Sequence, residues 1–176
     1  YDSKSYYYIH ISSGNAKRIQ NNIQPTGNST IQIDRFDDHQ FHEQDLVNIS
    51  RLGRQWFGES FDFKSEQEFS FNFPNIDTSF PLKINATFAA AAFVPTTFTV
   101  STDGQNNAST TVAAIVPNSE INFNVAFLPN NTTAIGAENT KIKITFNNGD
   151  VPGSKGYLDY INVIAKRKLQ GYGKQF

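Results

Sequence analysis

The chain has 176 residues, with no cysteine, no methionine and a formal net charge of −1 at pH 7. This length suits one domain with at most an appendage. Without cysteine, the chain cannot itself provide disulfides, thiolate-bound zinc or a cysteine nucleophile. The near-zero net charge gives no reason to expect nucleic acid as a partner. Because the sequence starts Tyr1-Asp2-Ser3, we expect a piece excised from a longer protein.

Aromatic residues make up 14% of the chain, with 16 Phe, 7 Tyr and 1 Trp. Phe and Tyr favour strands, whereas the abundant Asn and Gly favour turns. No apolar run is long enough to cross a membrane as a helix. The composition therefore predicts an all-β protein without a membrane span.

Residues 1–35 are predicted to form N-terminal strands and a loop. The stretches 6–11 and 30–36 have strand-like composition, and the segment between them is polar. The sequence leaves two alternatives open for this region: it packs on the following domain, or it belongs to a neighbouring one. Residues 36–176 are predicted to form the main domain.

One short helix is predicted in the main domain, over residues 42–54. Leu46, Ile49 and Leu52 recur at helical spacing, and Gly53 could end the helix. From residue 67 onward, apolar and polar residues alternate with a period of two, which is typical of half-buried strands. The predicted strands lie at 69–73, 82–88, 97–101, 110–116, 121–127, 141–146 and 157–165.

Turn signals separate these predicted strands. Asp103-Gly104, which favours a tight hairpin, follows the strand at 97–101. About seven short strands spaced by turns are typical of an antiparallel sandwich. We therefore predict a jelly-roll-like β-sandwich for residues 36–176, with at most one short helix.

The densest group of ionisable residues runs from Asp34 to Asp45 and includes His39 and His42. On a helix these two histidines would share a face and, with nearby carboxylates, could bind a metal or support hydrolysis. Their spacing matches no metal-binding motif, and no Gly-x-Ser-x-Gly sequence occurs. The simpler interpretation is a charged loop that caps the next turn, with no cofactor.

Aromatic side chains could also present flat faces to a sugar. The candidates are Trp56, Phe57, Tyr157 and Tyr160. The alternative for Trp56 is packing in the core or against another domain. A carbohydrate-binding jelly roll that stacks a sugar on Trp56 or Tyr157 therefore remains an alternative function.

Two motifs are more specific than these patterns. The first runs from His42 to Phe61 and contains Gly53-Arg54-Gln55-Trp56-Phe57-Gly58-Glu59-Ser60-Phe61. The second runs from Gly156 to Leu169, begins Gly156-Tyr157-Leu158-Asp159-Tyr160-Ile161, and is followed by Gly171 to Phe176. Together they resemble the region upstream of the peptidase domain in PorU-like proteins, the gingipain-like sortases of the Bacteroidetes type IX secretion system. The resemblance covers about residues 36 to 176.

The resemblance implies a cell-surface parent protein, a cysteine peptidase that removes the C-terminal sorting domain from secreted cargo. This piece would be a non-catalytic domain that scaffolds the parent or contacts a partner. The implied partners are other domains of the parent and an outer-membrane attachment complex with a PorV-like protein. The motif residues singled out as structural or interaction sites are Arg54, Trp56, Gly58, Glu59, Tyr157 and Asp159. Arg54 and Glu59 are expected to form an ion pair beside Trp56.

Overall fold

The computed structural model describes residues 6–11, 13–15, 17–21, 23, 26–28 and 31–171. The chain divides into two units, Tyr1–Gln32 and Ile33–Phe176. In the described part of the first unit no residue lies in a strand, so the strand predicted over residues 6–11 is wrong. Its side chains are exposed, and a strand needs a neighbour to satisfy its backbone groups. The separate status of residues 1–35 stays a prediction.

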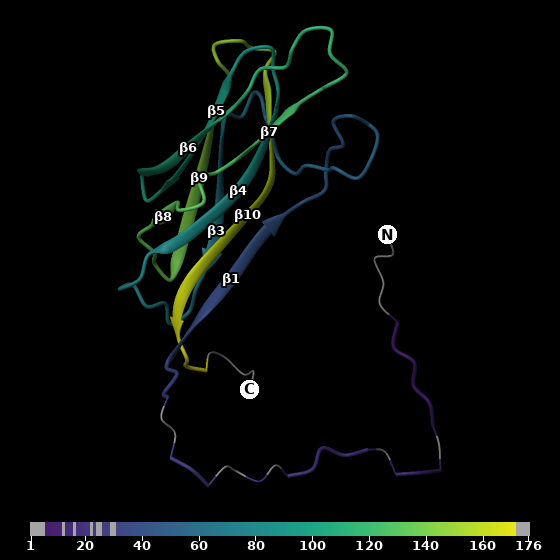
Figure 1. The fold of residues 1–176 in the computed structure, drawn as a ribbon, viewed down its shortest axis with the longest axis vertical. Helices are drawn as coiled ribbons and strands as arrows, with labels where there is room; N and C mark the ends of the chain where they lie inside the picture. Colours follow the sequence, from purple (N-terminus) through teal and green to yellow (C-terminus); the bar gives the residue numbers. More distant parts are fainter. Residues whose placement is uncertain are drawn as a thin grey trace. The chain divides into compact units, whose positions relative to one another are not determined.

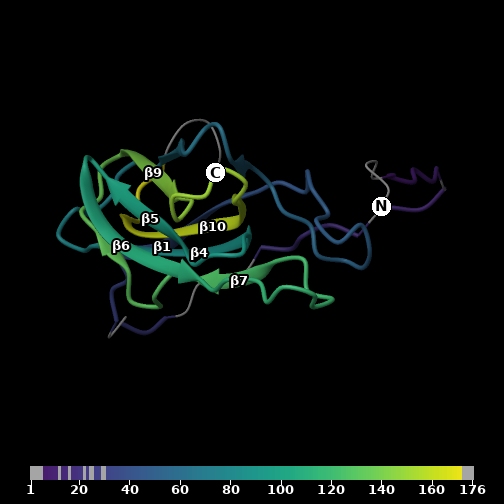
Figure 2. The same ribbon diagram turned by 90° about the horizontal axis from the view of Figure 1, so that it is seen from above.

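The second unit is a sandwich of two antiparallel sheets (Figures 1 and 2). The first sheet has the strand order β1-β10-β4-β7. Two short strands complete it: β2 pairs with β10, and β8 pairs with β4. Its strands are β1 (Arg35–Glu43), β2 (Ser60–Phe61), β4 (Leu82–Ala91), β7 (Asn124–Phe127), β8 (Thr133–Ala134) and β10 (Lys155–Lys168). The second sheet, in the order β3-β9-β5-β6, comprises β3 (Glu66–Asn72), β9 (Asn139–Asn147), β5 (Thr96–Thr102) and β6 (Gln105–Val112).

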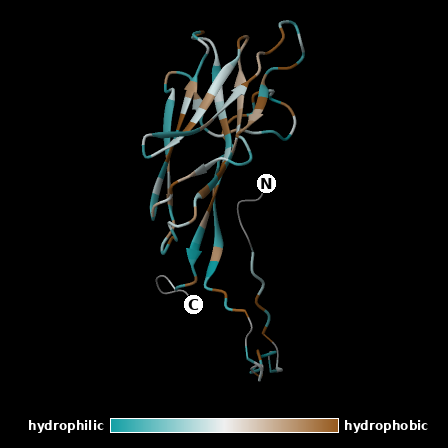
Figure 3. Ribbon diagram, turned by 60° about the vertical axis from the view of Figure 1, so that its left-hand side comes forward, coloured by the Kyte–Doolittle hydropathy of each residue, from teal (hydrophilic) through white to brown (hydrophobic). Residues whose placement is uncertain are grey.

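This architecture confirms the predicted antiparallel jelly-roll-like β-sandwich. The predicted alternation is visible along the strands when the ribbon is coloured by hydropathy (Figure 3). The turn at Asp103-Gly104 is also confirmed: both residues have positive φ, +48° and +78°, and they join β5 to β6 directly. The returning strand therefore begins at Gln105 rather than at residue 110.

The helix predicted over residues 42–54 is absent. His42 lies in β1, and Val47 instead forms an isolated bridge with Phe57. The three apolar residues at helical spacing do not share one buried face. Leu46 and Leu52 are exposed, whereas Ile49 packs in a small apolar cluster. Burial of a single apolar residue does not stabilise a helical face.

Aromatic rings fill the core between the two sheets. Phe98 on β5 stacks on Phe88 of β4, with ring centroids 4.4 Å apart and an angle of 10° between the rings. Phe146 on β9 is tilted against Phe98 at 4.8 Å, and Phe61 meets Phe98 edge-on at 5.5 Å. These contacts join both sheets at one point in the core.

Gly156 on β10 lies directly against this ring cluster. A Cβ atom built at Gly156 would come within 2.6 Å of Phe98 Cζ and 2.7 Å of Phe146 Cδ2. Real Cβ contacts are never this short, so any side chain here would displace rings that are already close-packed. The glycine that opens the second motif is thus required by packing.

We predict that Gly156→Ala lowers the free energy of unfolding by about 1–3 kcal/mol through overpacking. The matched control is Gly153→Ala, because a Cβ at Gly153 would have no heavy atom within 4 Å. The control should change stability by less than about 0.5 kcal/mol. Urea unfolding monitored by circular dichroism measures both values, and equal effects for the two variants would contradict the packing role of Gly156.

Candidate functional site

The outward face of the first sheet carries a row of polar and aromatic side chains at its centre. Antiparallel pairing places Phe41 on β1 opposite Asn162 on β10, and Asn162 opposite Asn85 on β4. The next row along the strands contains Tyr160 opposite Thr87. Thr87 itself is buried. We call the exposed surface formed by Phe41, Tyr160, Asn162, Asn85, Asn130 and Phe127 the open face.

A β-bulge in β10 determines which residues reach the open face. The register shifts between Leu158 and Tyr160, so Asp159 is the extra residue of the bulge. Leu158 is fully buried in the core between the sheets, and so is Ile161. Without the bulge, strict alternation would turn Tyr160 inward with Leu158. The extra residue therefore brings Tyr160 and Asn162 to the outward side.

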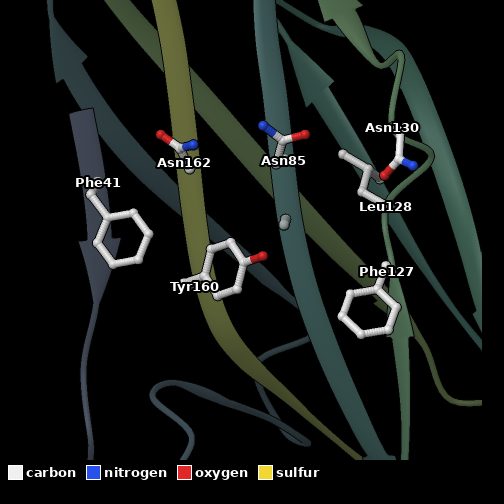
Figure 4. Close-up of a pocket in the computed structure, with 8 residues that line it drawn as sticks. Phe41, Asn85, Phe127, Leu128, Asn130, Tyr160 and Asn162 are labelled. Carbon is white, nitrogen blue, oxygen red and sulfur yellow. The ribbon is translucent and has the colours of Figure 1, made fainter. Parts of the chain in front are cut away.

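Three aromatic rings are available on the open face. Phe41 is 57% exposed and Phe127 is 66% exposed. Tyr160, half-buried, stacks on Phe41 with ring centroids 5.4 Å apart and an angle of 23° between the rings. Figure 4 shows Phe41 and Phe127 on either side of the two central strands, with Tyr160 between them.

Three asparagine amides share the open face with these rings. Asn85 and Asn162 project from the two central strands, and Asn130 follows β7 (Figure 4). None of the three amides forms a hydrogen bond with another described residue, whereas Asn124 donates to the carbonyls of Ala113 and Ala114. Together with Leu128 and Ala86, rings and amides line an open hollow of about 340 Å³ without a charged residue.

The other half of the same outward face is covered. Phe57 and Tyr157 pack with Ala89 of β4 in a small buried cluster, joined by half-buried side chains from the 44–59 and 113–123 segments. Phe57 meets Phe123 edge-on at 5.2 Å. The sheet thus has a covered half and an open half, and the motif residue Phe57 belongs to the covered half.

The first motif mostly builds the segment that covers this half. Gly58 lies close to the chain around Gln44: a Cβ would be 3.0 Å from the Gln44 carbonyl oxygen. Glu59 Oε1 is 2.8 Å from His42 Nε2, and among the described residues no ion pair joins Glu59 to Arg54, which is exposed. The expected Arg54–Glu59 pair is therefore wrong. Trp56 is 43% exposed.

The two residues singled out in the second motif lie on or beside the bulge. Tyr157 is only 8% exposed, and burial raises the pKa of its hydroxyl. Burial also raises the pKa of Asp159, with added repulsion from Glu43 and Asp45. Tyr157 therefore has no free face for stacking a sugar, in contrast to Tyr160.

The acidic and histidine-rich stretch is an edge strand, not a capping loop. Because they are three positions apart on β1, His39 and His42 lie on opposite faces, and only His42 is half-buried. His42 packs on Phe69 with centroids 4.7 Å apart. The described residues contain no group of three potential metal-ligating side chains. Neither the metal site nor the histidine-based hydrolase considered from sequence is assembled here.

Ion pairs with the end of β10 explain the charges of β1. Lys166 Nζ is 2.7 Å from Asp37 Oδ1, and Arg167 Nη1 is 2.8 Å from Asp38 Oδ2. The hydrogen bond from Lys166 lowers the pKa of Asp37. The acidic start and the basic end of the domain thus neutralise each other in antiparallel register.

In the part of the chain that the structure describes, no helix has the length and apolarity of a membrane span. No protein-family model matches the chain, and comparison with curated proteins gives no significant match. Among solved structures, it is similar to part of dimeric latent PorU from Porphyromonas gingivalis, with a TM-score of 0.68 and 23% identity. The match covers 80% of this chain and 14% of that chain. The chain thus has the fold of a PorU region, which confirms the predicted resemblance at the level of fold.

Two carbohydrate-binding modules of type CBM36 are less similar. One, solved with calcium and xylotriose, has a TM-score of 0.44 and 14% identity, over 70% of this chain and 98% of that chain. The other comes from a xylanase of the hindgut metagenome of Trinervitermes trinervoides, with a TM-score of 0.45 and 9% identity. It covers 78% of this chain and 100% of that chain.

We predict that Asp77→Asn lowers the free energy of unfolding at neutral pH. The free energy of unfolding of this variant should also decrease less between neutral and acidic pH than that of the native chain. Hydrogen bonds from Ser79 and from Arg35, whose Nε lies 2.5 Å from Asp77 Oδ2, lower the pKa of Asp77 from 3.8 to about 2. Since the pKa is lower in the folded state, this contribution is present above about pH 4 and is lost as the pH falls through about 2.

Urea unfolding between pH 7 and pH 2 tests this dependence. The matched control is Asp103→Asn on the β5–β6 turn, where the exposed carboxylate has no ion pair with any described residue. The control should keep the acid-induced loss of stability seen in the native chain. A native-like pH profile for Asp77→Asn would contradict the assignment.

Proposed function

We propose that this chain is a non-catalytic β-sandwich domain of a PorU-like cell-surface cysteine peptidase. The observation that carries the proposal is the fold similarity to a region of PorU over 80% of the chain. The chain spans 14% of that protein and contains no cysteine, so the peptidase chemistry would reside elsewhere in the parent. Removal of the C-terminal sorting domain from type IX cargo is proposed for the parent and not for this domain.

The environments of the motif residues support a structural role within this domain. Gly156 leaves room for Phe98, and Gly58 allows the chain around Gln44 to approach β10. Glu59 and His42 form a hydrogen bond, which connects the covering segment to the edge strand β1. Motif residues that pack within the domain and fix its shape suit a domain whose role is to position the other domains of the parent protein. The half-exposed Trp56 is the motif residue best placed to contact another domain or a PorV-like partner.

The carbohydrate-binding alternative is weakened at one of its two expected platforms. Tyr157 is buried with Phe57 and Ala89, so a sugar cannot stack on its ring. Trp56 keeps an exposed part of its indole, but it is not among the residues that line the hollow on the open face. Any sugar site is therefore better sought on the open face.

The proposal predicts that the parent protein carries a gingipain-like domain with a catalytic Cys and His after this domain. In the full-length parent, Trp56→Ala should leave cleavage of a soluble peptide unchanged and reduce co-purification of the PorV-like protein severalfold. The matched control is Phe63→Ala, an exposed aromatic outside the first motif. A parent without a peptidase domain would refute the proposed function, and equal co-purification by both variants would refute the contact at Trp56.

A further inference from the structure

The amides of Asn85 and Asn162 occupy positions that sheet stability does not favour. The two residues lie opposite each other on β4 and β10, the two central strands of the sheet. Asparagine is depleted in strands, where β-branched residues pack better. Neither amide bonds to another described residue, so no part of the chain that the structure describes uses its donors and acceptors. A ligand that needs paired amides would account for both side chains.

The aromatic rings beside these amides offer flat apolar surfaces to solvent. Phe41 and Phe127 expose more than half of their surface, and the Phe41–Tyr160 stack holds the tyrosine ring in place. Tyr160 also carries a hydroxyl group, which points from β10 toward β4 (Figure 4). A ligand with one apolar face and polar edges would contact the rings and the amides at the same time.

The charges around the open face indicate a neutral ligand. None of the residues that line the hollow is ionisable at neutral pH. The nearest ionisable groups are Glu43 opposite Tyr160, Asp159 next to Tyr160 in the bulge, and Lys83 and His39 opposite Ile164. Glu43 and Asp159 lie at the Tyr160 end of the face and Lys83 lies at the other end, beyond Asn85 and Asn162, so all of these groups lie outside the lining of the hollow. A phosphate or polyanion would require a basic patch, and a divalent cation would require carboxylate ligands.

We propose that the open face binds a short neutral saccharide. The sugar would stack its C–H face on Tyr160 and its flanking phenylalanines, while neighbouring hydroxyls bond to Asn162, Asn85 and Asn130. Each hydroxyl both donates and accepts, as does each amide, so the pairing is complete without added charge. The hollow of about 340 Å³ lies in the size range of small-ligand sites. A dry protein interface would instead require a matched partner for every free amide. The site concerns this chain alone and does not depend on the proposed parent.

The first experiment is a glycan array with neutral, sulfated and uronic-acid oligosaccharides, followed by calorimetric titration of the best neutral ligand. We expect Tyr160→Ala to weaken binding about tenfold or more, because it removes the stacking ring and breaks the contact with Phe41. The matched control Trp56→Ala removes an exposed aromatic outside the hollow and should bind like the native chain.

A second variant separates binding from folding. The double substitution Asn85→Thr and Asn162→Thr removes both amides and introduces residues that favour strands. It should unfold at the same or a higher urea concentration than the native chain, yet bind the sugar about tenfold more weakly or worse. Loss of binding in a chain that is no less stable would identify the amides as ligand contacts.

Several outcomes would overturn the proposal. They are the absence of any neutral glycan ligand, preference for anionic glycans, loss of binding in Trp56→Ala, and unchanged affinity in the asparagine double variant. Self-association of the native chain that the double variant abolishes would likewise overturn it, because the open face would then be an interface between two copies.

Discussion

Strand β10 pairs with β1, β2 and β4, and its register determines which side chains enter the core and which face outward. The bulge at Asp159 changes the alternation within this strand. On the core side, Leu158 and Ile161 are both buried although they are three positions apart, where strict alternation would place them on opposite faces. On the outward side, Tyr157 and Tyr160 are also three residues apart and pair with Ala89 and Thr87 of β4. The Tyr-Leu-Asp-Tyr-Ile motif is therefore the sequence of a bulge that places two tyrosines on one face.

Alternation in the sequence was sufficient to predict the strands whose inward residues are large and apolar. It identified β3, β4, β5, β9 and β10, because a one-residue slip in any of them would expose several such residues. Strand β1 was missed, since Asp37 and Asp38 suggested a charged loop. Those carboxylates are accommodated in an edge strand because Lys166 and Arg167 lie beside them. That compensation comes from residues more than 120 positions away.

The open face was also hard to predict, because it depends on contacts between residues that are far apart in the sequence. Tyr160 was recognised as a possible sugar platform, but Asn85 and Asn162 were not singled out. Their proximity depends on the pairing of β4 with β10, which is a long-range property of the fold. The strand predicted over residues 121–127 begins only at Asn124 in the structure. The observed strand is short, and the ring at its end extends beyond the covered half of the sheet.

The two halves of the outward face show how the domain separates support from recognition. One half is covered by the segment that carries the first motif, and there Phe57 and Tyr157 exclude water from the sheet. An ordinary scaffold would gain stability by covering the other half as well, because burial of exposed Phe41 and Phe127 would stabilise the fold. Instead, the central positions of that half are occupied by amides, which oppose such burial unless each is paired. A surface that combines exposed rings with amides that no described residue pairs, on the two central strands, is suited to a ligand that provides both an apolar face and hydrogen bonds.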